Sequence, residues 1–562
     1  MQDSKTRSTW LRRLPSSLLA VSAFVLTFFF FSPSEMTLLN PSSFRFSAMG
    51  AVVPIMGLFS VVAIVLGAAI LALFRGKAHN VLVALCLAAT LCLYIQGTFM
   101  TGTTPPLSGD DVDWAAMNTA RIINLVEWVV IFSIPFILLR FKQIWGYARI
   151  LLPALIIIMQ LTGFISLVVR PDLSRTDVGY LSYDGLCDYS DQGNTLVIML
   201  DRLDFEYING VLAQDPEFFD RMDGFTRYDN AISQYAHTRP GMNFILTNYN
   251  ETMFKEPAVD FFEHSWDDGE RHILKDLTAA GYDVDLFGGI SSLLGQHYDS
   301  FTPYVSNIRL SSDNIRPVKL IYRMSVLSAY RCFPLAVKSK FYQSSTWYDH
   351  VFKKGTNFDT DMTVYDKTMP DMTLRSDRKC FKFYEFQGSH SPYNLNADGT
   401  KSKEKTNVVA QTMGSFEILF RAFDKMKEAG IYKDTAIIIT ADHSYMHSDY
   451  KPLEAPARIG IFYKPAGVED TPFQTSYAPV SLRNIPATVI KSAGLDYAAY
   501  GVPLDEVPDD KTIVRDYIRS IADKSIGWID CWALYYDVAY DAADMDSWTL
   551  TRTEKIEYPL SF

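Results

Sequence analysis

Several features that would point to a function at once are missing from this sequence. It has only six cysteines, with neither CxxC spacing nor the Cys/His spacing of a zinc site. No internal repeat or low-complexity linker is present. The net charge is −11, which argues against a general nucleic-acid binder. A chain of 562 residues nevertheless exceeds one ordinary hydrophobic core, so two or more domains are expected.

The sequence does not decide whether the cysteines form disulfides or remain free thiols. Cys86 and Cys92 lie inside an apolar run, where we expect them to pack as small residues. The other four lie in the rest of the chain: Cys187, Cys332, Cys380 and Cys531. If that part is outside the cell, they form one or two disulfides whose pairing the sequence does not fix; otherwise they are buried free thiols.

Long hydrophobic runs are absent after about residue 170, but five precede it. Each has roughly 17–25 residues, enough to cross a bilayer. They cover residues 14–31, 49–74, 81–100, 122–139 and 150–169. Arg12 and Arg13 before the first run would suit a signal peptide, yet no small-x-small cleavage site follows, so we expect an uncleaved span.

The basic residues predict the orientation of these spans. Lysines and arginines concentrate in the N-terminal tail and in the second-to-third and fourth-to-fifth connections. Such connections stay on the cytoplasmic side. We therefore expect a multi-pass protein of the cell membrane, with a cytoplasmic N-terminus and an extracytoplasmic region after residue 169.

That region alternates between strand and helix patterns. Apolar strands are expected at residues 195–200, 284–287, 381–386, 436–440 and 459–463, and helices at 273–280, 417–427 and 482–493. The alternation predicts an α/β fold, with a mostly parallel sheet flanked by helices. The expected domains are a transmembrane domain (1–172), an extracytoplasmic catalytic domain (173–510) and a C-terminal tail of unknown role (511–562).

Side chains that can bind a metal ion follow two of the expected strands. Asp201 ends the strand at 195–200, and Asp442 and His443 end the strand at 436–440. Open α/β sheets build sites at the carboxyl ends of their strands. A carboxylate and an imidazole together suit zinc or manganese, whereas an Asp at a strand end is also a common helix cap. The hypothesis is one metal site made from Asp201, Thr238, Asp442 and His443, with His390 nearby.

Thr238 is a candidate site residue because of its position at the predicted start of a helix. Pro240 suits the first turn of a helix, which places Thr238 at or just before a helix N-terminus, where phosphate or sulfate binds. A metal on its oxygen would favour the alkoxide and create a nucleophile. An ordinary Thr cap is the alternative. Arg239 either holds a phosphate oxygen or faces solvent.

Two histidines complete the set. His390, in the loop Gly388-Ser389-His390-Ser391-Pro392, is suited to stabilise an oxyanion or protonate a leaving group, or it is a plain loop residue. His447, four residues beyond His443, either supports the site or lies on a surface loop.

Together these segments resemble the alkaline phosphatase/sulfatase superfamily. The chain looks most like its membrane-anchored lipoteichoic acid synthase and phosphoethanolamine transferase branches, over about residues 190–500. The matching stretches are NTLVIMLDRLD, AHTRPGMNFILTN, FKFYEFQGSHSPYN, DTAIIITADHS and ARIGIFYKPAG.

The resemblance implies roles for individual residues. One Mn²⁺ or Zn²⁺ would be bound by Asp201, Thr238, Asp442 and His443. Thr238 would form a phospho-threonine, and His390 would contact the transferred or leaving group. Arg239, His390 and His447 are the expected substrate-binding residues. The chain departs from the lipoteichoic branch in having Asp201 where Glu is usual, and His447 and Asp449 in place of that branch's usual residues. It departs from sulfatases too, since residues 238–242 read TRPGM instead of the C/S-x-P-x-R that they oxidise to formylglycine.

The expected function is accordingly that of a membrane-bound, metal-dependent transferase. It would move a phospholipid head group, phosphoglycerol or phosphoethanolamine, to a cell-surface glycan or polymer. Two alternatives stay open: a sulfatase-like phosphodiesterase or sulfuric ester hydrolase with water as acceptor, and a non-catalytic relative that serves as a binding module.

Overall fold

The computed structural model divides the chain into two compact units. The first comprises Met1–Tyr180 and Leu310–Thr356, and the second Leu181–Arg309 and Asn357–Phe562. The residues that the structure describes are 10, 13–44, 46–102, 104–105, 107, 112–170, 179–249, 253–256, 261, 264–265, 272–288, 301–310, 314–348, 350–353, 361, 372–445, 452–523 and 529–558.

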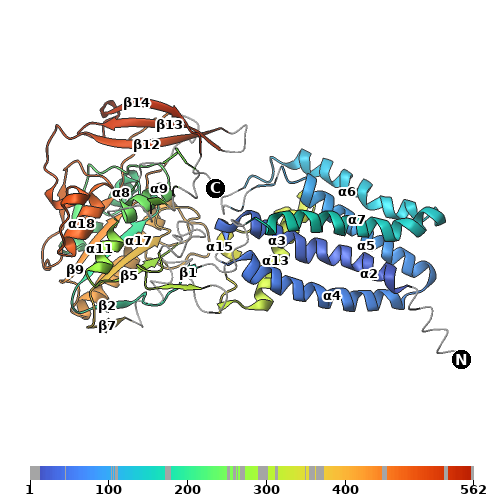
Figure 1. Ribbon diagram of the computed structural model, residues 1–562. Helices are drawn as coiled ribbons and strands as arrows, with labels where there is room; N and C mark the ends of the chain where they lie inside the picture. The colour runs from blue at the N-terminus through green and yellow to red at the C-terminus, as the bar shows by residue number, and fades with distance from the viewer. Residues whose placement is uncertain are drawn as a thin grey trace. The chain divides into compact units, whose positions relative to one another are not determined.

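The first unit contains five helices long and apolar enough to cross a membrane (Figure 1). The first of them, Leu14–Leu39, is continuous but changes its winding, from α2 (Leu14–Val25) through the π-helical turn η1 (Leu26–Phe31) to α3 (Ser32–Leu39). The other four are η3 with α4 (Ala48–Val52 and Val53–Leu73), α5 (Gly76–Phe99), α6 (Asn118–Leu138) and α7 (Lys142–Val168).

A segment from the middle of the chain also belongs to this unit. It forms α13 (Pro317–Cys332), α14 (Leu335–Lys338) and α15 (Ser345–Tyr348). Leu320, Met324 and Leu327 recur at helical spacing and pack into one apolar cluster with Phe44 and Phe46. The first unit, with its five apolar helices, is thus built from two separate stretches of sequence.

The second unit is organised around a seven-stranded sheet of order β11-β4-β10-β9-β3-β8-β5. Its members are β3 (Asn194–Leu200), β4 (Thr226–Tyr228), β5 (Asp283–Phe287), β8 (Cys380–Phe386), β9 (Thr435–Thr440), β10 (Ile461–Lys464) and β11 (Gln474–Ser476). Only β10 runs against the others, since it pairs antiparallel with both β9 and β4. Strands β3 and β9 are buried at every position, as expected of parallel strands covered on both faces.

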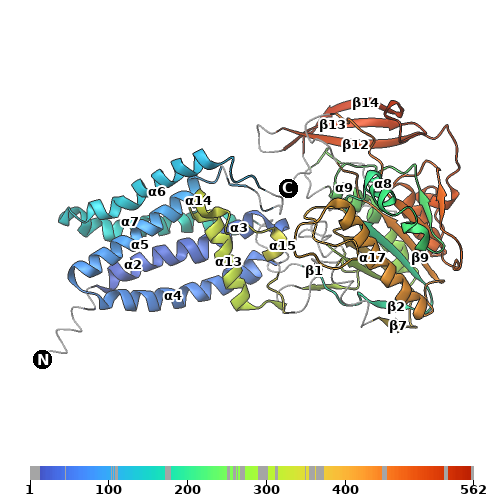
Figure 2. The same ribbon diagram turned by 180° about the vertical axis from the view of Figure 1, so that it is seen from behind.

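Helices cover both faces of this sheet. Helices α11 and α18 lie in front of it in Figure 1, whereas α17 lies in front in the reverse view of Figure 2. Helix α17 packs on α8, while α9, α11 and α18 contact one another. These helices are α8 (Phe205–Gln214), α9 (Thr238–Thr247), α11 (Ile273–Ala279), α17 (Val408–Glu428) and α18 (Asn484–Ser492). Two further two-stranded sheets pair β1 (Gly179–Leu181) with β6 (Ile308–Leu310) and β2 (Asp188–Ser190) with β7 (Thr373–Arg375).

The C-terminal tail forms an antiparallel sheet of β12 (Arg515–Asp523), β13 (Ile529–Val538) and β14 (Trp548–Lys555). Tyr517, Tyr536 and Trp548 of this sheet share an apolar cluster with Ile232 and Ala236. The tail therefore packs on the segment that leads into α9.

The predicted α/β fold and the five apolar helices are confirmed. The five expected strands correspond to β3, β5, β8, β9 and β10, with small shifts at their ends. Helix α17 begins at Val408, nine residues before the expected start at 417, because Asn407 caps it through the N–H of Ala410. All six cysteines carry free thiols.

A buried ion pair between neighbouring strands of the sheet gives a test of this core. Lys382 on β8 donates 2.6 Å hydrogen bonds to Asp285 on β5 and to the carbonyl of Gly185. Lys382→Met leaves a buried carboxylate without its cation, so we expect the free energy of unfolding to fall by about 3–5 kcal/mol. Urea unfolding of the full chain in detergent measures this.

Lys425→Met is the matched control, because Lys425 pairs with the exposed Glu428. Its effect should stay below about 0.5 kcal/mol. Equal effects of the two substitutions would contradict the structural role of the buried pair.

Candidate metal centre

The centre is assembled at the carboxyl ends of β3 and β9. These strands are parallel neighbours, with Met199 opposite Thr440, so the residues that follow them meet at one edge of the sheet. Asp201 comes from β3, and Asp442 and His443 come from β9. One oxygen of each carboxylate and one ring nitrogen of His443 all lie within 4.8 Å of one another.

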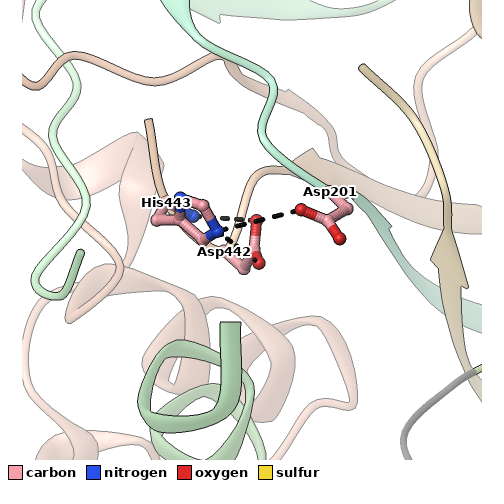
Figure 3. Close-up of side chains that lie close together, drawn as sticks. All are labelled: Asp201, Asp442 and His443. Atoms are coloured by element: carbon pink, nitrogen blue, oxygen red, sulfur yellow. Dashed lines mark hydrogen bonds and ion pairs between the residues drawn. The ribbon is translucent and has the colours of Figure 1, made fainter. Parts of the chain in front are cut away.

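The three side chains turn toward a common point (Figure 3). The Nε2 atom of His443 lies 3.4 Å from Asp442 Oδ2 and 3.8 Å from Asp201 Oδ1. Both carboxylate oxygens are buried and have no hydrogen-bond partner among the described residues. Such orphaned acceptors are costly unless a proton or a cation satisfies them.

Backbone contacts fix the orientation of these ligands. Asp442 Oδ1 accepts the N–H groups of Arg202 (2.9 Å) and His443 (2.8 Å), which leaves Oδ2 for the centre. His443 Nδ1 donates to the carbonyl of Ser444 at 2.7 Å, so Nε2 carries the lone pair that faces the carboxylates.

Electrostatics favours a cation at this point. Burial, reinforced by the charge of Asp442, raises the pKa of Asp201 well above its usual range. Burial also lowers the pKa of His443 to about 4, so its imidazole is neutral at physiological pH. Two carboxylates and a neutral imidazole, with a hydroxyl beside them, are a donor set that suits Zn²⁺ or Mn²⁺.

Thr238 joins this group from the first turn of α9. Its Oγ1 lies 3.3 Å from His443 Nε2. The approach depends on Gly241 one turn later, because a Cβ there would lie 2.7 Å from the carbonyl oxygen of Asp442. The N–H groups and positive dipole end of α9 point toward the same region, as in anion-binding sites.

The segment before Thr238 is held by the C-terminal sheet. His237 Nε2 lies 2.7 Å from Ser520 Oγ on β12, and the N–H of Ile518 donates to the carbonyl of Gln234 at 2.9 Å. The sequence pattern gave no signal for this support, because the partners are about 280 residues apart in the chain.

The other expected site residues are less directly connected. His390 lies on the loop after β8, next to Ser389, whose N–H donates to the carbonyl of Asp201. It is not part of the cluster of potential ligands within the described residues, and its Nδ1 donates to the Ser391 carbonyl at 2.5 Å. Arg239 is half-buried, and burial lowers its pKa to about 9, so it stays cationic at neutral pH. His447 lies outside the described residues.

Arg202 was not anticipated as a supporting residue, whereas Asp204 stands where a helix cap was expected. Arg202 adopts a left-handed backbone with φ of 59°, which aims its N–H at Asp442. Asp204 caps α8 through the N–H of Glu206, and its other oxygen accepts the N–H of Tyr445, two residues after His443. The position of Asp204 before a helix was the only sequence signal for these contacts.

The region that carries this centre can be assigned to a family. Residues 193–495 match the sulfatase family. The chain belongs to the sulfatase family. The match covers more than half of the chain and includes Asp201, Thr238, His390, Asp442 and His443, so the predicted superfamily is confirmed. Members of this superfamily are metal-dependent enzymes, hydrolases and transferases, and the cluster gives this sulfatase-family chain a possible metal site.

No curated protein matches the chain. Solved structures with a related fold include an alkaline phosphatase superfamily protein from Vibrio parahaemolyticus (13% identity, 68% of this chain and 85% of that chain, TM-score 0.38). A phosphonate monoester hydrolase from Silicibacter pomeroyi shows 15% identity over 63% and 88%, with a TM-score of 0.40. The lipoteichoic acid synthase LtaP from Listeria monocytogenes shows 11% identity over 66% and 88%, with a TM-score of 0.34.

Loss of one carboxylate ligand should remove the metal. For Asp442→Asn we expect the affinity for Mn²⁺ or Zn²⁺ to fall by more than about tenfold, since even an outer-sphere partner contributes that much. Elemental analysis of the purified full chain measures the metal content. Asp434→Asn changes an exposed carboxylate eight residues earlier and should leave the content at the wild-type level. Equal metal content in Asp442→Asn and wild type would rule out this centre.

The raised pKa of Asp201 predicts how metal affinity depends on pH. A carboxyl with a raised pKa holds its proton to higher pH, so this proton competes with the metal where an ordinary aspartate would not. His443 competes only near pH 4. Affinity should therefore rise with pH from mildly acidic conditions, with proton release on binding, measured by calorimetry in buffers of different ionisation enthalpy. An affinity that is independent of pH over this range would contradict the assignment.

Proposed function

We propose that this chain is a membrane-anchored, metal-dependent transferase with an extracytoplasmic catalytic domain. It moves a phosphoglycerol or phosphoethanolamine head group from a phospholipid, through a phospho-threonine, to a hydroxyl of a cell-surface glycan or polymer. The observation that carries the proposal is the position of Thr238 Oγ1, at the start of α9 and 3.3 Å from His443 Nε2. A hydroxyl at this place is suited to nucleophilic attack on phosphorus.

The metal set consists of Asp201, Thr238, Asp442 and His443, and one bound divalent cation would lower the pKa of the threonine hydroxyl and offset negative charge on the phosphoryl group. Thr238 Oγ gives its proton to solvent and attacks phosphorus. The Oγ–P bond forms, the P–O bond to diacylglycerol breaks, and the diacylglycerol oxygen takes up a proton, for which His390 is the proposed donor.

In the second half of the reaction the group leaves the phospho-threonine for the acceptor. A hydroxyl of the acceptor gives its proton to His390, which the first half leaves neutral, and attacks phosphorus as the Oγ–P bond to Thr238 breaks. Arg239, which remains cationic at neutral pH, is proposed to hold a phosphate oxygen in both steps. His447 is proposed to contact substrate from the segment after His443.

The nucleophile distinguishes this proposal from sulfate-ester hydrolysis. The chain has Thr238 where sulfatases carry the Cys or Ser that becomes formylglycine, and threonine does not yield that aldehyde. The five apolar helices on the same chain supply a second reason, because they hold the enzyme where lipid donors are concentrated. A hydrolase that uses water as the acceptor differs only in the second half of the reaction.

Intact mass of the full chain tests the nucleophile. After incubation with Mn²⁺ and mixed phosphatidylglycerol and phosphatidylethanolamine, we expect a covalent adduct on the wild type and none on Thr238→Ala. Thr238→Ser keeps a hydroxyl and should still form the adduct, which separates loss of the nucleophile from loss of structure. The adduct's mass identifies the head group.

Metal binding without an adduct or released diacylglycerol would refute lipid head-group transfer. Diacylglycerol release that needs no glycan acceptor, accompanied by free head-group phosphate, would assign water as the acceptor. A chain that binds neither metal nor lipid head group would be a non-catalytic relative.

A further inference from the structure

A partly open cavity of about 140 Å³ in the membrane unit is lined by both polar and apolar side chains. Its walls come from the first, third and fifth apolar helices and from α13. The polar side chains are those of Thr27, Ser32, Glu35, Tyr94, Thr98, Gln160 and Arg331. Polar and ionised side chains among membrane-spanning helices are costly, and they mark sites where something polar is bound or moved.

One ion pair forms the base of this cavity. Arg331 Nη2 donates to Glu35 Oε2 at 2.9 Å, and its other nitrogens donate to the carbonyls of Gly97 (3.0 Å) and Ser32 (3.1 Å). Helix α13 can come this close to α5 because Gly97 has no side chain. A Cβ at this position would lie 2.9 Å from Cys332 Sγ. The guanidinium is therefore satisfied by the protein, whereas no hydrogen bond within the described residues reaches Glu35 Oε1.

Other groups in the cavity also remain available to a ligand. Gln160 is 9% exposed, and its Oε1 accepts the hydroxyl of Thr27 at 2.8 Å. Neither its Nε2 nor the hydroxyl of Tyr94 has a hydrogen-bond partner among the described residues. The cavity thus offers a carboxylate that accepts N–H or O–H donors, an amide N–H that donates to an oxygen, and a hydroxyl that can do either, a combination that recognises a group with both donors and acceptors.

A larger, wholly apolar cavity of about 370 Å³ lies beside it. Phe24, Phe28, Trp128 and Phe132 line it from the helices, and Phe333 and Pro334 line it from the end of α13. Leu93 lines both cavities. A polar and an apolar cavity that share a wall match the two ends of an amphiphile.

The local backbone supports a binding role for this wall. The π-helical turn η1 supplies Thr27 to the polar cavity and Phe28 and Phe29 to the apolar one. Single π-helical turns inside α-helices occur frequently at functional sites. The end of α13 is divided between the cavities in the same way as η1. Arg331 and Cys332 line the first cavity, and the next two residues, Phe333 and Pro334, line the second.

We infer that the two cavities together hold one membrane phospholipid. Its head group carries hydrogen-bond donors, either the ammonium of ethanolamine or the hydroxyls of glycerol, which Glu35 accepts. Gln160 Nε2 donates to an oxygen of the lipid phosphate, and an acyl chain fills the apolar cavity. The occupant is a lipid because a bilayer surrounds these helices and supplies molecules with both ends. This inference concerns binding in the membrane unit and does not depend on transfer at Thr238.

Native mass spectrometry of the full chain in detergent tests the inference. The probes are phosphatidylethanolamine, phosphatidylglycerol and phosphatidylcholine with identical acyl chains. Choline lacks N–H and O–H donors, so we expect its lipid to bind at least about tenfold more weakly than the best of the other two. Preference for ethanolamine assigns the ammonium, and preference for glycerol assigns the hydroxyls. Equal binding of all three lipids would overturn the inference.

Three variants locate the binding. Glu35→Gln should reduce binding of the preferred lipid at least fivefold, whereas Glu127→Gln makes the same change on α6, outside both cavities, and should have no effect. Ala89→Phe fills the apolar cavity without touching a polar group and should also weaken binding.

Thermal unfolding of each variant shows whether it is folded. If Glu35→Gln leaves Arg331 unpaired and the protein unfolds, Ala89→Phe decides the question alone. Wild-type lipid binding in Ala89→Phe, or in a folded Glu35→Gln, would overturn the inference. Because the readout is retained lipid, an inactive Thr238→Ala chain should still bind the same lipid, which separates this result from failure of the proposed transferase.

Discussion

The second unit depends on two carboxylates that the sheet forces together. Asp201 and Asp442 follow adjacent parallel strands, and each presents one buried oxygen that no hydrogen bond from the described residues satisfies. Burial, reinforced by the charge of Asp442, raises the pKa of Asp201 well above its usual range. A divalent cation would offset this cost, because its charge attracts both carboxylates and satisfies the two oxygens. The neutral imidazole of His443 completes the set without adding charge.

The rest of the second unit serves to position these ligands. Backbone donors from Arg202 and His443 occupy one oxygen of Asp442, and the carbonyl of Ser444 selects the tautomer of His443. Helix α9 approaches closely enough for Thr238 only because Gly241 has no side chain. The C-terminal sheet holds the residues just before Thr238. The site is therefore shaped by contacts between segments that are hundreds of residues apart.

Because the site depends on both local patterns and distant contacts, only part of it could be predicted from the sequence. Apolar runs, strand ends and helix starts are local patterns, and they sufficed to place Asp201, Thr238, Asp442 and His443 and to predict the parallel sheet. The left-handed backbone of Arg202 and the contact between His237 and Ser520 arise only when distant segments meet. The antiparallel direction of β10 had no local signal either, because a short run of buried apolar residues is compatible with both parallel and antiparallel pairing. Helix α13 falls short of a membrane span, and nothing in its pattern indicated that it packs with the spans.

The path of the chain between the two units has a consequence for proteolytic release of the second unit. The chain leaves the first unit near residue 180, returns for residues 310–356 and leaves again. A protease that cut once between α7 and β1 would sever only the first of these three crossings. The second unit would stay joined by unbroken peptide to α13, whose Leu320, Met324 and Leu327 remain packed in the first unit. Release of the second unit therefore requires additional cuts on both sides of this segment.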